Sequence, residues 1–441
     1  MRKMYRAIAI LLFVISAQAA TLDVNPNGGQ YSSIQKAIDE ANTGDIIKVA
    51  AGTYHENVAI DISLTLQGAG SDNTIFDGGK SNSVLIVGGS NSNVDVSVSN
   101  MKIKNGKTTN GGGILNYGRL TITDSTVSGN TATSLGGGIY NEGIVDTSRG
   151  TITLNTANFG AGVFNNASTV TLNGGSVNYN IANADGGGIQ NRATINVNGV
   201  SITDNSAKGL VNPYGYTRPI GWGGGIYNDG TVTITGSIIS RNSANWRGGG
   251  IYSFSRLTIT GSTLSHNSAK KDGGGMLVDE SSITNIADST ISNNTASNLG
   301  GGIYNDATMN LNRVTIDHNN AQSAAGMYNW GWATLTDSKL SNNIATKNAG
   351  GFYNSANLAT IGGTTQITNN QAKTGYGGGI YADGGSVILS GINVGIKNNT
   401  AHLPSSQSSW KKGWGVFNWS ETIGMTDGFD PATQITANAN I

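Results

Sequence analysis

The sequence predicts an all-β chain wound into a single parallel β-helix, with a short capping α-helix near its N-terminus. Two sequence markers that recur in phase, and the strand-like segments between them, support this prediction. The first marker is a glycine triplet that is most often followed by Ile, Tyr and Asn. Intact triplets lie at 111–113, 136–138, 186–188, 223–225, 248–250, 273–275, 300–302 and 377–379. Most neighbouring copies are about 25 residues apart, a spacing typical of repeat arrays.

The second marker is an Asn followed two residues later by Ala. It recurs at Asn130, Asn155, Asn180, Asn205, Asn242, Asn267, Asn294, Asn319, Asn343, Asn370 and Asn399. Between the markers run segments such as 231–235 (Thr-Val-Thr-Ile-Thr), in which polar and apolar β-branched residues alternate. A unit of about 25 residues is too short for a propeller blade and lacks the helical period of ankyrin or tetratricopeptide repeats. Each unit is therefore expected to form one coil of a parallel β-helix.

Coils of a β-helix stack about 4.8 Å apart, so equivalent residues form columns along its axis. The column directly after the glycines is apolar and is expected to face inward: Ile114, Ile139, Val163, Ile189, Ile226, Ile251, Met276, Ile303, Met327, Phe352, Ile380 and Val416. Strand alternation turns the next column outward, where it would form an aromatic stripe: Leu115, Tyr140, Phe164, Gln190, Tyr227, Tyr252, Leu277, Tyr304, Tyr328, Tyr353, Tyr381 and Phe417. The third column is mostly Asn, and stacked amides that bond to neighbouring coils give it a structural role.

The first 20 residues have the pattern of a signal peptide. Arg2, Lys3 and Arg6 precede an apolar run, and Ala17-Gln18-Ala19 has the small-x-small pattern of a cleavage site. No later stretch is long and apolar enough to cross a membrane as a helix. The chain has no cysteine, so its stability outside the cytoplasm must come from strand ladders and core packing. The expected location is secreted, extracellular or at the cell surface, with outer-membrane association as one form of it.

The charge of the chain is balanced, with 26 basic and 26 acidic residues. A formal net charge of zero argues against a nucleic-acid partner and against general attraction to anionic membranes. Only 12% of the residues are charged. The polar surface is expected to consist mainly of Asn, Ser and Thr, as in an extracellular β-solenoid.

Residues 21–110 differ from the regular array at 111–441. Ser33 has the position of an N-cap, and Ile34, Ala37, Ile38 and Ala41 have helical spacing, so a short amphipathic helix should end before Gly44 and cover the open end of the first coil. The strands expected near 46–49, 64–66, 84–87 and 96–103 form irregular first coils. Two insertions, at 208–222 and 402–414, interrupt the repeats.

Residues 31–79 resemble the opening of secreted right-handed β-helix proteins of the pectin-lyase-like superfamily. The residues that carry this resemblance are Ser33-Ile34-Gln35-Lys36-Ala37-Ile38, Gly44-Asp45, Gly52-Thr53-Tyr54-His55-Glu56, Leu64-Thr65-Leu66-Gln67-Gly68 and Ile75-Phe76-Asp77-Gly78. The triplet repeats are similar to those of polymorphic outer-membrane proteins and related surface adhesins. Together the two resemblances imply a right-handed helix, but this scaffold carries both enzymes and adhesins.

The local catalytic signatures of pectin methylesterases, polygalacturonases and pectate lyases are missing from the sequence. The best catalytic candidates are Asp204, Arg241 and His266, which precede the Asn marker on successive coils. The spacing would place these mixed acid and base groups about 5 Å apart. The alternative is a solvated corner, since other coils carry Gly129, Leu154 and Tyr179 at this position.

Aromatic residues in and near the two insertions suit the flat faces of sugars. The glycan-binding candidates are Tyr214, Tyr216, Trp222, Trp246, Trp410 and Trp414. The alternative is that these rings cover the apolar surface of the coils, which is the favoured interpretation for other turn aromatics such as Trp330 and Trp332.

The expected function is that of an adhesin-like protein that binds an extracellular polysaccharide or a surface protein. The alternative is a polysaccharide lyase or hydrolase, and a third possibility is a spacer without a ligand. No metal site and no cofactor are expected. Ca²⁺ would be needed only by a lyase, which requires clustered carboxylates.

Overall fold

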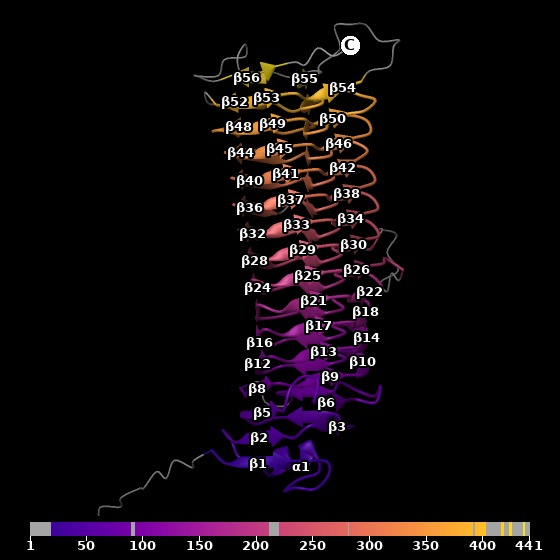
Figure 1. Cartoon of the computed structure of the whole chain (residues 1–441), viewed down its shortest axis with the longest axis vertical. Coiled ribbons are helices and arrows are strands. Elements are labelled where there is room, and N and C mark those ends of the chain that lie inside the picture. Colours follow the sequence, from indigo (N-terminus) through magenta and orange to yellow (C-terminus); the bar gives the residue numbers. More distant parts are fainter. Residues whose placement is uncertain are drawn as a thin grey trace, which may run out of the picture.

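The computed structural model describes residues 19–89, 93–210, 220–280, 282–390 and 393–402, together with the backbone of three short strands beyond them. Its coils stack along one axis, from the first strand at one end to the last strands at the other (Figure 1). Every strand pairing between successive coils is parallel, and four sheets run along the axis, here named A to D. A regular coil passes through sheets C, A, B and D in that order.

Sheet A has 16 strands. They are β1 (Thr21–Val24), β2 (Ile46–Val49), β5 (Leu64–Gly68), β8 (Asp95–Ser99), β12 (Arg119–Thr123), β16 (Ile144–Ser148), β20 (Thr169–Asn173), β24 (Thr194–Asn198), β28 (Thr231–Thr235), β32 (Leu257–Thr260), β36 (Ile283–Ala287), β40 (Thr308–Asn312), β44 (Trp332–Thr336), β48 (Ala359–Gly362), β52 (Val387–Ser390) and β56 (Ile423–Met425).

Sheet B has 15 strands. They are β3 (Gly52–Tyr54), β6 (Thr74–Asp77), β9 (Lys102–Lys104), β13 (Thr126–Ser128), β17 (Thr151–Thr153), β21 (Ser176–Asn178), β25 (Ser201–Thr203), β29 (Ile238–Ser240), β33 (Thr263–Ser265), β37 (Thr290–Ser292), β41 (Thr315–Asp317), β45 (Lys339–Ser341), β49 (Gln366–Thr368), β53 (Gly395–Lys397) and β57 (Ile435–Thr436).

Sheet C has 14 strands. They are β4 (Val58–Ile60), β7 (Leu85–Val87), β11 (Ile114–Asn116), β15 (Ile139–Asn141), β19 (Val163–Asn165), β23 (Ile189–Asn191), β27 (Ile226–Asn228), β31 (Ile251–Ser253), β35 (Met276–Val278), β39 (Ile303–Asn305), β43 (Met327–Asn329), β47 (Phe352–Asn354), β51 (Ile380–Ala382) and β55 (Val416–Asn418).

Sheet D has 12 strands, most of them two residues long. They are β10 (Lys107–Asn110), β14 (Thr131–Leu135), β18 (Thr156–Ala157), β22 (Ile181–Ala182), β26 (Ser206–Ala207), β30 (Ser243–Ala244), β34 (Ser268–Ala269), β38 (Thr295–Ala296), β42 (Asn320–Ala321), β46 (Ile344–Ala345), β50 (Gln371–Ala372) and β54 (Thr400–Ala401). Because sheet D starts at β10, the coils before it are built from three sheets.

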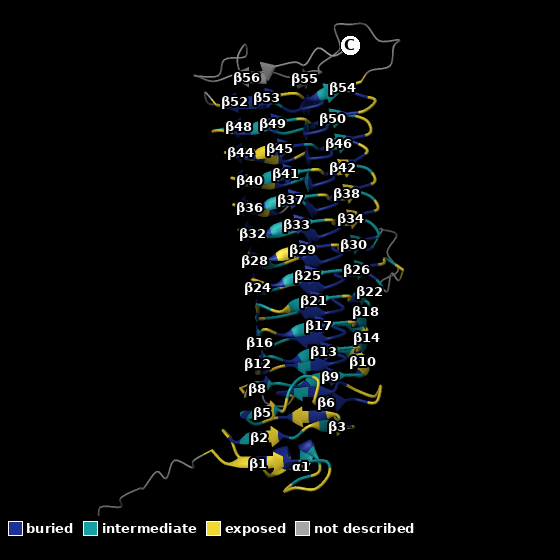
Figure 2. Ribbon diagram, viewed as in Figure 1, coloured by how far each residue is buried: buried dark blue, intermediate teal, exposed yellow. Residues whose placement is uncertain are grey.

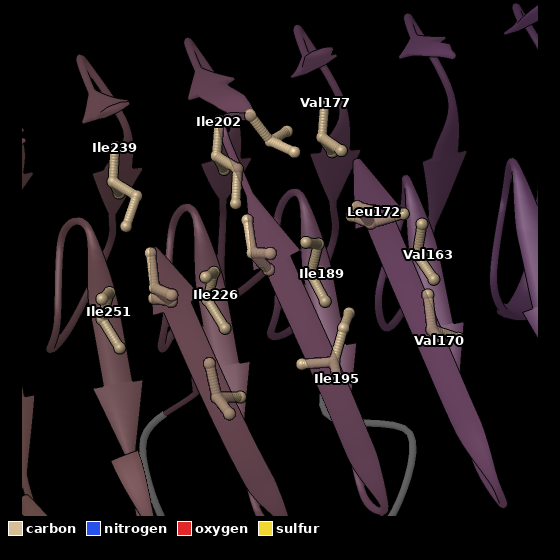
Figure 3. Packing of buried hydrophobic residues seen from close by; sticks show 14 of the residues in the cluster. Val163, Val170, Leu172, Val177, Ile189, Ile195, Ile202, Ile226, Ile239 and Ile251 are labelled. Atoms are coloured by element: carbon tan, nitrogen blue, oxygen red, sulfur yellow. The ribbon is translucent and has the colours of Figure 1, made fainter. Parts of the chain in front are cut away.

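The columns predicted from the repeats are present in register. Ile226, Tyr227 and Asn228 of β27 pair with Ile251, Tyr252 and Ser253 of β31, and the same register continues along sheet C. The apolar residues after the glycines face those of sheets A and B in one core that runs along the axis (Figures 2 and 3). Fully burying each such side chain contributes about 1.5–3 kcal/mol.

The Asn of each Asn-x-Ala marker lies buried at the corner between sheets B and D. The Asn242 backbone N–H and Nδ2 both donate to Oδ1 of Asn267 at 3.0 Å. Nδ2 of Asn267 donates in turn to Oδ1 of Asn294 at 3.0 Å and to the Ile239 carbonyl at 2.9 Å. The same pattern repeats from Asn130 to Asn399. The amide ladder predicted for the third column of sheet C is a second one, in which Nδ2 of one Asn donates to Oδ1 of the next, as from Asn141 to Asn165 at 2.9 Å, and it is confirmed.

The predicted capping helix is present as α1 (Ile34–Glu40). Ser33 is its N-cap and accepts a hydrogen bond from the Lys36 N–H, while the Glu56 carboxylate accepts from the Ile34 N–H at 3.0 Å. The apolar face of α1 is buried in the same core as the first coils. In the described part of the chain no helix has the length and apolar character needed to span a bilayer. The predicted signal peptide lies almost wholly outside the described residues.

As strand alternation predicted, the aromatic column of sheet C points away from the main core, but other residues cover most of its rings. Tyr140 is 7% exposed, and Phe164 and Tyr252 are 0% exposed. After each sheet D strand the chain turns back toward the glycine triplet, and residues just before the triplets pack on the rings, among them Phe159 and Trp222. The returning segments therefore cover the outer face of sheet C, and together with sheet D they are here called the flange.

Candidate functional site at the corner between sheets C and A

A short turn carries each coil from sheet C into sheet A, and its first residue forms a column of chemically varied side chains. From Glu142 onward the column consists of Glu142, Asn166, Arg192, Asp229, Phe254, Asp279, Asp306, Trp330, Ser355 and Asp383. The register of sheet C pairs Val278 with Asn305 and Asn305 with Asn329. Asp279, Asp306 and Trp330 therefore follow one another on successive coils, about 4.8 Å apart.

Buried and half-buried tyrosines of sheet C hydrogen-bond to this column. The Tyr252 hydroxyl donates to Oδ2 of Asp279, and the Tyr353 hydroxyl donates to Oδ2 of Asp383 at 3.0 Å. Burial, and then the carboxylate of Asp279, raises the pKa of Tyr252 above its ordinary value. Burial also raises the pKa of Tyr381 to about 12. The tyrosines therefore orient the carboxylates of the corner.

Asp306 is the carboxyl group of this corner whose environment favours the protonated form. Burial raises its pKa to about 6, and the negative charges of Asp279 and Glu280 add to this effect. Arg247 opposes the shift, but its Nε is bound at 3.0 Å to Oδ2 of Asp272, which is 1% exposed. Asp306 therefore changes its charge close to neutral pH.

Asp306→Asn is expected to raise the free energy of unfolding at pH 7.5 by about 1 kcal/mol, after a discount for partial solvent exposure. The folded-state pKa of Asp306 is about 6, against an ordinary value of 3.8. The folded chain therefore holds an extra proton between these pH values, and its stability falls as the pH rises through 6. Asn removes this dependence, which equilibrium unfolding from pH 4.5 to 7.5 measures. Asp229→Asn, an exposed aspartate of the same column, is the control, and equal curves for the two variants would contradict the assignment.

Trp330 and Trp332 lie next to Asp306 and are exposed. Their exposed fractions are 47% and 55%, and only Gly331 separates them in the chain. Trp332 begins β44 and pairs with Thr308, two residues beyond Asp306. Packing was the prediction for these two indoles. The structure instead leaves both indoles exposed on the coil after Asp306, and the sequence signal for them was Trp-Gly-Trp at a turn.

The three catalytic candidates lie at the corner between sheets B and D, as the spacing predicted. Arg241 Nε and Nη2 donate to the Asp204 carboxylate at 2.8 and 2.9 Å, and His266 is exposed on the next coil. All three residues have a positive φ of 54–58°. Arg149 with Asp124, and Arg313 with Asp288, join successive coils by the same two-bond geometry. The Asp204–Arg241 pair thus has the geometry of an ion pair that joins two coils, and its catalytic role stays a prediction.

The aromatic candidates divide into buried rings and residues outside the described ranges. Trp222 is 6% exposed, and its ring stacks on Tyr252 with a centroid separation of 4.7 Å. A ligand could therefore not contact the Trp222 ring without opening the cluster. Trp246 is half-buried, with Lys271 Nζ 4.4 Å from its ring centroid. The remaining candidates lie outside the described residues: Tyr214, Tyr216, Trp410 and Trp414.

The described ranges contain no cluster of side chains that would suit a metal ion. There, no group of three or more His, Asp or Glu side chains is arranged so that it could hold a metal ion. Within the corner, the Asp279 carboxylate instead accepts a hydrogen bond from the Tyr252 hydroxyl. The chemistry that this corner offers is hydrogen bonding, aromatic contact and proton exchange.

Comparisons with known proteins agree with the repeat architecture. The family model of the Chlamydia polymorphic membrane protein repeat matches residues 124–142, 288–306 and 364–383. Each match ends at a carboxylate of the corner column: Glu142, Asp306 or Asp383. The chain therefore carries repeats of this type and folds as a right-handed parallel β-solenoid, as the sequence resemblance implied.

Two solved structures are similar at low identity. One is a pectin methylesterase mutant in complex with a hexasaccharide, with 11% identity, a TM-score of 0.31, and coverage of 66% of this chain and 80% of that chain. The other is the A-module of the Azotobacter vinelandii mannuronan C-5 epimerase AlgE6, with 13% identity, a TM-score of 0.20, and coverage of 88% and 95%. A search of curated sequences finds no match.

Proposed function

We propose that this chain is an adhesin-like bacterial surface protein that binds an uncharged carbohydrate at the Trp330–Trp332 corner. The repeat type supports the surface location, because the matching family model describes a membrane protein repeat. The observation that carries the binding proposal is the pair of indoles, 47% and 55% exposed, on the coil after Asp306, in a column where tyrosine hydroxyls bind the carboxylates of Asp279 and Asp383.

The chemistry of this corner suits a sugar. An exposed indole offers a flat apolar face to the C–H side of a pyranose, while carboxylates and phenols bond to hydroxyl groups at its edge. The described corner turns from 117 to 385 contain six acidic residues (Glu142, Asp229, Asp279, Glu280, Asp306 and Asp383) and two basic residues (Arg192 and Arg256). The negative potential of this surface disfavours anionic polymers and leaves an uncharged glycan as the better ligand.

A second candidate function is hydrolysis of a glycosidic bond. Asp279 and Asp306 lie on adjacent coils, and Asp306 has a pKa of about 6, so one carboxyl group can stay protonated beside another. Paired carboxyl groups of this kind act as acid and base in glycosidases. This alternative predicts new reducing ends that disappear in Asp306→Asn, whereas the binding proposal predicts retention without product.

The binding proposal predicts that Trp330→Ala with Trp332→Ala weakens retention on an uncharged polysaccharide by about tenfold or more, since stacked aromatic anchors dominate such sites. Retention is measured on immobilised cellulose, xylan, mannan and chitin. The control is Tyr179→Asn, which removes an aromatic residue that is 53% exposed and has a positive φ of 53° that Asn tolerates.

Two results would contradict this site. The first is unchanged retention in the tryptophan double variant. The second is loss of retention in Trp410→Ala with Trp414→Ala while the double variant binds normally, which would move the binding face to the second insertion. The melting temperature of each variant shows that the fold is intact.

A further inference from the structure

The flange of sheet D has a charge opposite to that of the Trp330–Trp332 corner. The described segments between each Asn marker and the following glycine triplet contain five lysines, one arginine and two aspartates. The basic residues are Lys208, Arg247, Lys270, Lys271, Lys347 and Lys373. Both aspartates, Asp185 and Asp272, are buried, and Asp272 is paired with Arg247. The exposed charge of the flange is therefore positive.

Two hollows lie on the outer face of sheet D. The first, of 440 Å³, lies over β26, β30 and β34 and has Lys208 and Lys270 in its wall. The second, of 280 Å³, lies over β38, β42 and β46 and has Lys373 in its wall. Because these strands are consecutive in sheet D, the two hollows follow one another along the sheet, and this stretch is here called the D lane. From β26 to β50 the D lane spans seven coils, or about 29 Å at the usual strand spacing.

The lysines of the D lane are exposed and are not neutralised nearby. Lys208, Lys270 and Lys373 are exposed, as is Lys347 beside the second hollow. Among the described residues no carboxylate lies within 4.0 Å of these four side chains, whereas Lys102 and Lys104 elsewhere have aspartate partners. Exposed lysines without partners can bind an anion without first breaking an ion pair.

Neutral hydrogen-bonding groups fill the lane between the lysines. Ser206, Ser243, Ser268 and Thr295 occupy equivalent positions on four successive strands, and the Ser243 hydroxyl donates to the Ser206 hydroxyl at 3.1 Å. Asn245, Asn320 and Gln322 add amides to the walls of the hollows. A linear ligand that alternates hydroxyl groups with negative charges would match this arrangement.

The residues that line the hollows also indicate which class of anionic polymer fits this site. Single-stranded nucleic acid is normally held by aromatic rings on which its bases stack, and among the described residues neither hollow has an aromatic side chain in its wall. Peripheral membrane binding relies on a continuous apolar face that enters the lipid. The described walls are mainly Ser, Thr, Asn, Lys and Ala, and their larger apolar side chains are Leu210 in the first hollow and Ile344 in the second. A polysaccharide with carboxylate or sulfate groups needs neither feature.

We propose that the D lane, from β26 to β50, binds a linear anionic polysaccharide through Lys208, Lys270 and Lys373 and the hydroxyl column between them. This site is separate from the Trp330–Trp332 corner and differs from it in ligand chemistry. The chain then presents two binding faces of opposite charge on one rigid solenoid. The inference does not depend on whether the corner binds an uncharged glycan.

The test uses the purified full chain with polygalacturonate and dextran sulfate as probes, and Lys208→Gln/Lys270→Gln/Lys373→Gln as the variant. We expect affinity for polygalacturonate to fall by about tenfold in the variant, and its salt dependence to become shallower because fewer counterions are released. The matched control is Lys48→Gln/Lys339→Gln/Lys397→Gln, which removes three exposed lysines from sheets A and B. Affinity in this control should stay within about twofold of the wild type.

Several outcomes would overturn the proposal. Absence of polygalacturonate and dextran sulfate binding at about 50 mM salt would exclude the site. Equal losses in the two lysine variants would reduce it to general charge attraction. Equal or tighter binding of single-stranded DNA, polyglutamate or phosphatidylglycerol vesicles would contradict the assignment to polysaccharide. Trp330→Ala/Trp332→Ala should leave polygalacturonate binding unchanged, so failure of the corner site and failure of the D lane give different results.

Discussion

Asn267→Ala is expected to lower the free energy of unfolding by about 4 kcal/mol. Asn267 is 1% exposed, and its side chain takes part in four hydrogen bonds to three neighbouring residues. Alanine removes all four bonds. It leaves the Asn242 N–H and the Ile239 carbonyl buried without these partners. Each unpaired group in such a site costs about 1–3 kcal/mol.

The control for Asn267→Ala is Asn320→Ala, which removes an exposed amide from β42. We expect a change within about 0.5 kcal/mol for this control. Urea unfolding gives the free energies, and hydrogen exchange shows whether the coils next to residue 267 open first, as nearest-neighbour coupling in a solenoid predicts. Equal effects of the two substitutions would show that the ladder is not a main source of stability.

Gly250→Ala is expected to cost about 3 kcal/mol or more. A Cβ at this position would lie 2.6 Å from the Gly275 carbonyl oxygen and 3.0 Å from Cγ of Asn267. The first of these atoms belongs to the backbone of the next coil and the second to the amide ladder, so neither can move alone. A lower melting temperature and weaker protection of the Asn267 amide would measure the effect.

The repeats themselves supply a control for this prediction. Eleven described coils contain an intact or altered glycine triplet, and its third position is glycine in all of them. The second position is alanine in two of these coils, at Ala161 and Ala325. Those two methyl groups pack in small alanine clusters beside sheet D. Gly236→Ala is the engineered control, because a Cβ there meets no atom within 4 Å and only the positive φ of 56° opposes the change. A cost for Gly250→Ala no larger than that for Gly236→Ala would contradict the account of close coil stacking.

The fold was predictable because the same chemistry recurs at the same position in every coil. The inward Ile column buries apolar side chains, and the buried Asn ladder pairs amides between coils. Because each role recurs at one position of every repeat, its residues form a recognisable pattern in the sequence. The covering of the aromatic column was not predictable in this way. Alternation indicates which face of a strand Tyr252 occupies, but it does not show that the returning segment with Trp222 lies over that face.

The candidate site was harder to predict because it depends on exceptions to the repeat. Trp330 replaces the aspartate that the two preceding coils have in this column, and nothing in a single sequence tells whether such a ring is covered. Tryptophan is usually largely buried, which made packing the reasonable expectation. The spacing did place Asp204 next to Arg241 correctly, but it could not show that their bonds serve to join coils.

The most direct test of the proposed function incubates the purified chain with uncharged and acidic polysaccharides, with and without Ca²⁺. Bound protein and released reducing or unsaturated ends are followed in the same wells, for the wild type and for Trp330→Ala/Trp332→Ala. We predict that the wild type is retained on an uncharged glycan, that the double variant is not, and that neither releases product. Release of new ends by the wild type would contradict a binding role without catalysis, and retention on the uncharged glycan that survives in the double variant would contradict the site.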